Sequence, residues 1–144
     1  MTSSDERRLT LVYSLKAPTA KVYAALTDPE KIVRWWGPDT GPTVSATADV
    51  RPGGHFKVVF RTEDGREYTN YGVYREVVKD EKLVFTWHHP EAPERDSLVT
   101  VLLKAVDGGT ELTLIHEGLP DEKTRDSHRD GWKGALNKLQ AFVA

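Results

Sequence analysis

Apolar and polar residues alternate with a period of two along most of this chain, a pattern typical of half-buried β-strands. In the first such segment, one parity holds Leu9, Leu11, Tyr13 and Leu15, and the other holds Thr10, Val12 and Ser14. From residue 44 onward, similar segments are separated by turn signals such as Asp64-Gly65 and Gly108-Gly109. The pattern therefore predicts a curved, mostly antiparallel sheet of about six or seven strands.

One parity of the predicted strands carries large apolar side chains and is expected to face the core. This parity holds Phe56, Val58, Phe60, Leu83, Phe85, Trp87, Val99, Val101, Leu103, Leu112, Leu114 and His116. In the segment from Tyr68 to Val78, however, Tyr74 and Val77 fall on opposite parities. A β-bulge would reconcile them, and the sequence leaves the register of this strand open.

Helical spacing is confined to two parts of the chain. Apolar residues recur every three or four positions between residues 17 and 36, and Asp28-Pro29 interrupts them, which predicts two short helices after the first strand. Asp121 is a candidate N-cap for one long helix from Glu122 to Val143. The apolar stripe of this helix consists of Trp132, Ala135, Leu136, Leu139, Phe142 and Val143. Because the sheet offers the one large apolar surface, we expect the long helix to pack on it.

The predicted order of elements is that of a single α+β domain over residues 8–144, preceded by a flexible tail of residues 1–7. A length of 144 residues suits one hydrophobic core. A curved sheet wrapped on one long helix leaves room for an interior pocket, above all where wide aromatic side chains splay apart. We therefore expect a mostly apolar pocket between the sheet and the helix.

Composition excludes several classes of function. The net charge is −2, and Lys and Arg are scattered, so no basic stripe for nucleic acid is present. The absence of cysteine excludes disulfides, thiolate nucleophiles and cysteine-ligated metals. Neither a signal-peptide pattern nor a run of membrane-spanning length occurs, which predicts no membrane insertion and a cytoplasmic location.

The candidate binding residues are the large side chains expected to surround the pocket. They are Trp35, Trp36, Phe56, Phe60, Phe85, Trp87, Val101, Leu114, His116, Trp132 and Leu136. Indole rings offer rigid apolar faces and an N–H donor, so the tryptophans would suit a flat ligand. Each of these residues also has a simpler interpretation as core packing.

His116 is the one titratable residue on the inward parity. It is a candidate general base or ligand anchor, or else a core histidine with satisfied hydrogen bonds. His88, His89 and His128 do not form a metal-binding pattern, and the glycine pairs lack the spacing of a phosphate loop. The sequence therefore predicts no metal, no cofactor and no assembled set of catalytic residues.

Six motifs resemble one known family in their order and spacing. They are WWGP, DVRPGGHF, YGVYREVV, KLVFTW, GGTELTLIHEGL and HRDGWKGALNKL. From Leu9 to Val143 the chain resembles the homologues of the heat-shock-protein-ninety ATPase activator, within the START-like helix-grip superfamily. This resemblance implies the helix-grip fold, but the superfamily includes lipid carriers, aromatic-polyketide enzymes and hormone receptors, so it does not fix the function.

Three functions are compatible with these observations. The leading expectation is a non-catalytic binding module that takes up a small apolar or amphipathic molecule, either lipid-like or aromatic. The resemblance also implies a co-chaperone-like protein-interaction module, with a chaperone as partner. The third alternative is an enzyme of the polyketide-cyclase type that uses His116 for proton transfer.

Overall fold

The computed structural model describes residues 7–36, 43–61, 64–88 and 96–144. Its sheet contains seven strands in the spatial order β1-β7-β6-β5-β4-β3-β2, and every neighbouring pair is antiparallel. The elements are β1 (Arg8–Leu15), α2 (Thr19–Thr27), α3 (Pro29–Trp35), β2 (Thr43–Ala48), β3 (His55–Arg61), β4 (Glu67–Val78), β5 (Lys82–Trp87), β6 (Ser97–Val106), β7 (Gly109–Glu117) and α4 (Glu122–Val143). The predicted helix-grip architecture is confirmed.

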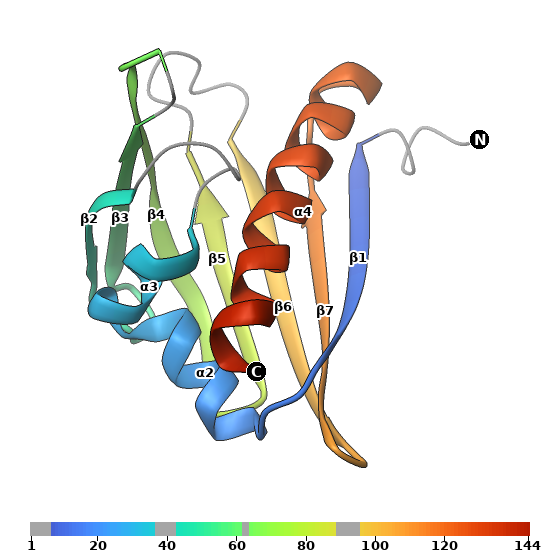
Figure 1. The fold of residues 1–144 in the computed structure, drawn as a ribbon. Coiled ribbons are helices and arrows are strands. Elements are labelled where there is room, and N and C mark those ends of the chain that lie inside the picture. The colour runs from blue at the N-terminus through green and yellow to red at the C-terminus, as the bar shows by residue number, and fades with distance from the viewer. Residues whose placement is uncertain (1–6, 37–42, 62–63, 89–95) are drawn as a thin grey trace.

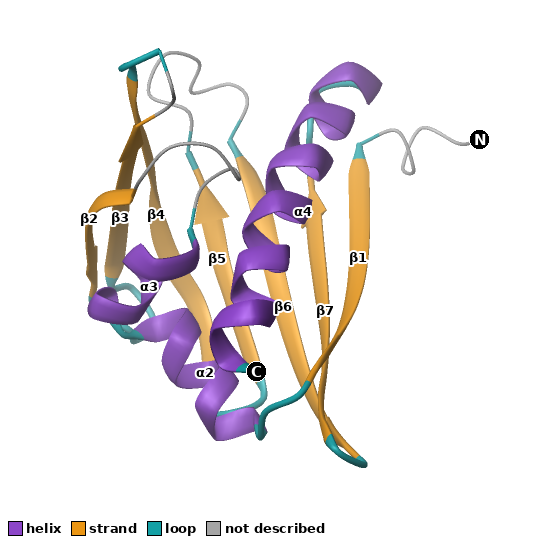
Figure 2. Ribbon diagram, viewed as in Figure 1, coloured by secondary structure: helices purple, strands orange, loops and turns teal. Residues whose placement is uncertain are grey.

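All three helices of the described chain lie on one side of the sheet (Figure 1). The long helix α4 crosses the sheet diagonally (Figure 2), while α3 lies against β2 and α2 contacts β6 and β7. Strand β1 closes the opposite edge by pairing with β7 along its length, from Arg8 opposite Glu117 to Leu15 opposite Thr110. One face of the sheet is therefore covered, and any interior space must lie between that face and the helices.

Local capping explains where the helices begin. The Asp28 side chain accepts a hydrogen bond from the Glu30 amide, and Pro29 occupies the first helical position, so α2 ends and α3 starts at this point. The Asp121 carboxylate accepts a hydrogen bond from the Thr124 amide at the start of α4. Both predicted helix boundaries are confirmed.

The predicted parity of the sheet is confirmed, because the residues assigned to the inward face are buried, with Phe60 half-buried. In β4 the pairing shifts between Tyr74 and Glu76, so a bulge places both Tyr74 and Val77 toward the core. This bulge settles the register that the alternation left open.

One residue of the predicted helical stripe is not part of the core. Phe142 is 39% exposed, whereas Leu139 and Val143 are buried. At about 100° per residue, Phe142 lies roughly 80° from the centre of the stripe, at its edge. Assigning Phe142 to the buried stripe was therefore wrong.

No helix in the described part of the chain is long and apolar enough to cross a membrane. The predicted tail falls mostly on residues 1–6, which lie outside the described residues.

Candidate functional site

Among the residues that the structure describes, two neighbouring cavities lie between the sheet and the helices. The first, called here the inner cavity, has a volume of only about 20 Å³. Its wall consists of Leu26, Ile32, Trp35, Trp36, Phe56, Val58, Tyr74, Leu83, Phe85, Val101, Leu112, Leu114, Trp132 and Leu136. That volume has room for about one water molecule, so the interior of the domain is a packed core.

The second, called here the outer cavity, has a volume of about 390 Å³. Its wall consists of Trp36, Phe60, Tyr68, Asn70, Trp87, Ser127, His128, Gly131, Trp132 and Ala135. These residues come from the end of α3, from β3, β4 and β5, and from the segment Ser127–Ala135 of α4. The volume lies within the range of about 300–1,000 Å³ that small-molecule sites occupy.

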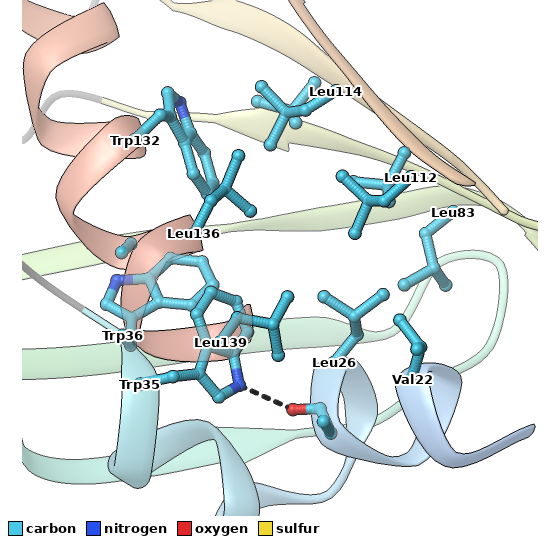
Figure 3. Packing of buried hydrophobic residues seen from close by; sticks show 14 of the residues in the cluster. Val22, Leu26, Trp35, Trp36, Leu83, Leu112, Leu114, Trp132, Leu136 and Leu139 are labelled. Carbon is cyan, nitrogen blue, oxygen red and sulfur yellow. Dashed lines mark hydrogen bonds between the residues drawn. The ribbon is translucent and has the colours of Figure 1, made fainter. Parts of the chain in front are cut away.

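Trp36 and Trp132 line both cavities and form the partition between them. The Trp36 ring stacks on Trp87 at a centroid distance of 5.9 Å and meets Trp132 edge-on at 5.7 Å. The Trp36 indole N–H also donates to Asn70 Oδ1 at 2.9 Å. Figure 3 shows Trp36 and Trp132 at one end of the packed side chains, with Val22 and Leu83 at the other. The aromatic partition is thus fixed by ring contacts and by a hydrogen bond.

The neighbouring Trp35 has a different role. Its side chain is 1% exposed, and its indole N–H donates to the Ala25 carbonyl oxygen at 2.7 Å, the dashed line in Figure 3. Trp35 contributes to the inner wall and not to the outer one. Of the two adjacent tryptophans, Trp35 packs the core while Trp36 reaches the outer cavity.

His116 is a fully buried residue at the end of β7. The Trp132 indole N–H donates to His116 Nδ1 at 3.1 Å, and because an indole can only donate, Nδ1 must be the unprotonated nitrogen. The hydrogen of the neutral ring is then on Nε2, which donates to Ser97 Oγ at 2.7 Å. His116 therefore holds the Trp132 indole in place through this hydrogen bond. The described walls of the two cavities do not include His116.

The predicted pocket residues divide between the two cavities. Trp36 and Trp132 line both, Phe60 and Trp87 line the outer cavity, and His116 lines neither. The remaining six line the inner cavity alone: Trp35, Phe56, Phe85, Val101, Leu114 and Leu136. The sequence pattern thus predicted large side chains that line both cavities, but it did not predict that there are two cavities.

The outer wall also contains residues that the sequence analysis missed. They are Tyr68, Asn70, Ser127, His128, Gly131 and Ala135. Two signals pointed toward them. Tyr68 pairs with Phe60 across the hairpin that contains Gly65, and His128 lies one helical turn before Trp132.

His128 is the titratable group of the outer wall with a shifted pKa. Burial lowers the pKa of His128, and this effect outweighs the opposing hydrogen bond from Nδ1 to the Thr124 carbonyl oxygen at 2.8 Å. Its ring also lies edge-on to His116, at a centroid distance of 5.1 Å. His128 is therefore neutral at physiological pH, and its neutral tautomer carries the hydrogen on Nδ1.

The helix side of the outer cavity includes the small residues Ser127, Gly131 and Ala135 beside His128 and Trp132. A Cβ atom added at Gly131 would meet no heavy atom within 4 Å, so the missing side chain leaves open space. Ala135, one turn further along α4, belongs to the same wall. The residues described by the structure contain no group of three His, Asp or Glu side chains that could hold a metal ion.

Solved structures with the same fold include a Chromobacterium violaceum protein, at 28% sequence identity and a TM-score of 0.84, covering 95% of this chain and 96% of that one. An AHSA1-like protein from Aeromonas hydrophila has a TM-score of 0.81 at 21% identity, covering 94% of this chain and 91% of that one. No significant match exists among curated proteins. The family model described as "Activator of Hsp90 ATPase homolog 1-like protein" matches residues 16–144, which confirms the resemblance of the sequence motifs. The chain belongs to this family of Activator of Hsp90 ATPase homolog 1-like proteins.

Proposed function

We propose that this protein is a non-catalytic binding module that takes up a small apolar or amphipathic molecule in its outer cavity. The observation that carries the proposal is a cavity of about 390 Å³ whose wall combines five aromatic rings with the polar side chains of Asn70, Ser127 and His128. Binding sites for small molecules typically combine an apolar wall with a few polar groups that fix orientation.

The size of the two cavities decides which of them is the proposed site. A volume of about 20 Å³ excludes any lipid-like or aromatic ligand from the inner cavity while the core stays packed as it is. The outer cavity is large enough for a molecule of two fused rings or a short amphipathic chain. The ligand would therefore contact Trp36, Trp87 and Trp132 from outside the core.

Gly131 gives a second argument. A glycine inside a helix costs about 1 kcal/mol of stability relative to alanine. At this position it leaves the space of a side chain open to the outer cavity. The residue thus lowers helix stability and enlarges the cavity at the same time.

We propose a non-catalytic role because of the hydrogen bonds and the position of His116. His116 is engaged at both ring nitrogens by Trp132 and Ser97, and it is absent from the described wall of the outer cavity. A general base must lie within hydrogen-bond reach of the substrate. The co-chaperone-like function stays a prediction from the resemblance.

The proposal is tested by filling the cavity from the helix side. We would screen uncharged aromatic compounds and short-chain alcohols by tryptophan fluorescence and thermal shift, and then repeat the titrations with Gly131→Leu and Gly131→Ala. Both substitutions raise helix propensity, so both proteins should be at least as stable as the wild type. Only the leucine occupies the volume, so Gly131→Leu should abolish binding while Gly131→Ala retains it.

Two results would contradict the proposal. One is a library in which no compound changes the tryptophan emission or the melting temperature of the wild-type protein. The other is a compound that binds Gly131→Leu as tightly as it binds the wild type, since its site would then lie elsewhere.

A further inference from the structure

The hydrogen bond between Trp36 and Asn70 fixes the orientation of a polar group in the outer wall. The Trp36 indole can only donate, so the atom of Asn70 that lies 2.9 Å from it must be the amide oxygen. The amide nitrogen of Asn70 then carries two hydrogens, and no hydrogen bond in the described part of the chain uses them. Asn70 therefore presents both amide hydrogens to whatever enters the cavity, while its oxygen already accepts from Trp36.

Both indole donors of the partition already have acceptors within the protein. The Trp132 N–H is bonded to His116 Nδ1, and the Trp36 N–H is bonded to Asn70 itself. Neither of them is left to bind a ligand. Among the described residues of the outer wall, the Asn70 amide is thus a donor whose hydrogens are not committed to the protein.

The described part of the outer wall carries no Lys, Arg, Asp or Glu. His128 is neutral near pH 7, because burial lowers its pKa. An ion that entered would exchange its hydration for aromatic carbon without meeting an opposite charge. A cation is disfavoured further, because it would approach the positive end of the Asn70 amide, which opposes any attraction to the ring faces.

We propose that the ligand of the outer cavity is an uncharged aromatic molecule with an oxygen acceptor, such as a ketone or an ester, that binds the amide hydrogens of Asn70. This inference rests on the proposed function and adds the chemical class of the ligand to it. Asn70 is then the residue that determines specificity. The aromatic rings contribute apolar contact that is common to many ligands.

The test uses four naphthalene compounds of similar size. The ketone is 2-acetonaphthone, the hydrocarbon is 2-ethylnaphthalene, the anion is 2-naphthoate, and the cation is 2-naphthylmethylammonium. Binding to the 144-residue chain is measured by tryptophan fluorescence and calorimetry at about pH 8, where His128 is neutral. We expect the ketone to bind tightest, the hydrocarbon several-fold more weakly, and both ions at least tenfold more weakly than the ketone.

The substitution Asn70→Asp tests the contribution of the two amide hydrogens to ligand binding. An aspartate keeps an oxygen to accept the Trp36 N–H and removes both amide hydrogens. In the N70D protein the ketone should lose its advantage over the hydrocarbon, and the ammonium compound should gain affinity. The matched control is Asn137→Asp on α4, where Asn137 is exposed and its Oδ1 accepts from the Tyr13 hydroxyl at 3.0 Å. The N137D protein should keep the wild-type order of affinities.

The outcomes separate this inference from the proposed function. If the naphthoate or the ammonium compound binds the wild type as tightly as the ketone, or if N70D leaves the order unchanged, the ligand class is wrong while the cavity still binds. If none of the four compounds binds and the wider library also fails, the proposed function is wrong and the inference fails with it.

Discussion

The inner and outer cavities share Trp36 and Trp132, yet their volumes are about 20 Å³ and about 390 Å³. The difference follows the size of the side chains that α4 presents along its length. Leu136 fills the space on the inner side, whereas Gly131 and Ala135 leave space on the outer side. The same helix thus closes the core with one face and borders the outer cavity with the neighbouring face.

The polar groups follow the same division. Inside, buried polar groups such as His116 and Ser97 are bonded to one another, which stabilises the core. On the outer side, Asn70 uses one end of its amide for Trp36 and leaves the other end for a ligand. Substitutions at the inner wall should therefore change stability most, and substitutions at the outer wall should change binding most.

The largest expected effect comes from the inner wall. Leu114 is 1% exposed, and Leu114→Ala should lower the free energy of unfolding by about 2–5 kcal/mol, because it opens a void in a packed core. Urea unfolding followed by circular dichroism measures this loss. The matched control is Leu102→Ala on β6, where the leucine is 37% exposed, and it should cost about 1.5 kcal/mol or less. Equal losses in the two proteins would contradict the contrast between a packed interior and its surroundings.

The sequence predicted the fold well, because the decisive signals are local. Period-two alternation marked the inward face of the sheet, and Asp28-Pro29 and Asp121 marked the helix boundaries. The register of β4 stayed open because Tyr74 and Val77 fall on opposite parities, and no regular register turns both toward the core. The pairing of Tyr74 with Phe85 and of Glu76 with Val84 shows the bulge that reconciles them.

The candidate site was less predictable, because its volume depends on contacts between distant segments. Trp36 stacks on Trp87 and donates a hydrogen bond to Asn70. Both partners are far from Trp36 in the sequence, and no local pattern predicts either contact. His116 was correctly placed on the inward parity, but its partners Ser97 and Trp132 lie on other elements. Aromatic residues could therefore be assigned to a pocket in general, while the separation into two cavities needed the packed structure.

The second-largest loss of stability is expected from the buried hydrogen bonds that His116 forms with Trp132 and Ser97. His116→Leu leaves the Trp132 N–H and the Ser97 hydroxyl without their partner, and it should lower the free energy of unfolding by about 2 kcal/mol. A glutamine can accept from Trp132 and donate to Ser97, so His116→Gln should restore part of that loss. Denaturant unfolding of both proteins is the measurement. A glutamine variant no more stable than the leucine variant would contradict the assigned tautomer.

A smaller effect should appear with pH. Because burial lowers the pKa of His128, the unfolded chain binds a proton more readily than the folded one, and stability falls as pH falls below about 6.5. The decline should continue until the pH reaches the lowered pKa of the folded state. Unfolding experiments between about pH 8 and 5 should show a shallower decline for His128→Gln than for the wild type. Parallel curves for the two proteins would assign the acid sensitivity to other groups.

The smallest expected change in stability lies at the outer wall, and it sharpens the comparison most. Phe60 is half-buried, and its ring stacks on Tyr68 at a centroid distance of 5.6 Å. Phe60→Ala should lower the free energy of unfolding by about 1 kcal/mol, since only part of the ring leaves an apolar environment. Phe60→Ala should nevertheless lower the affinity for a ligand of the outer cavity by about tenfold, because the ligand loses contact with one aromatic ring of the wall.

Leu114→Ala should do the reverse, with a large loss of stability and nearly unchanged affinity below its melting transition. If both variants changed stability and affinity in the same proportion, the two cavities would behave as one site, and the division at Trp36 and Trp132 would have no functional meaning.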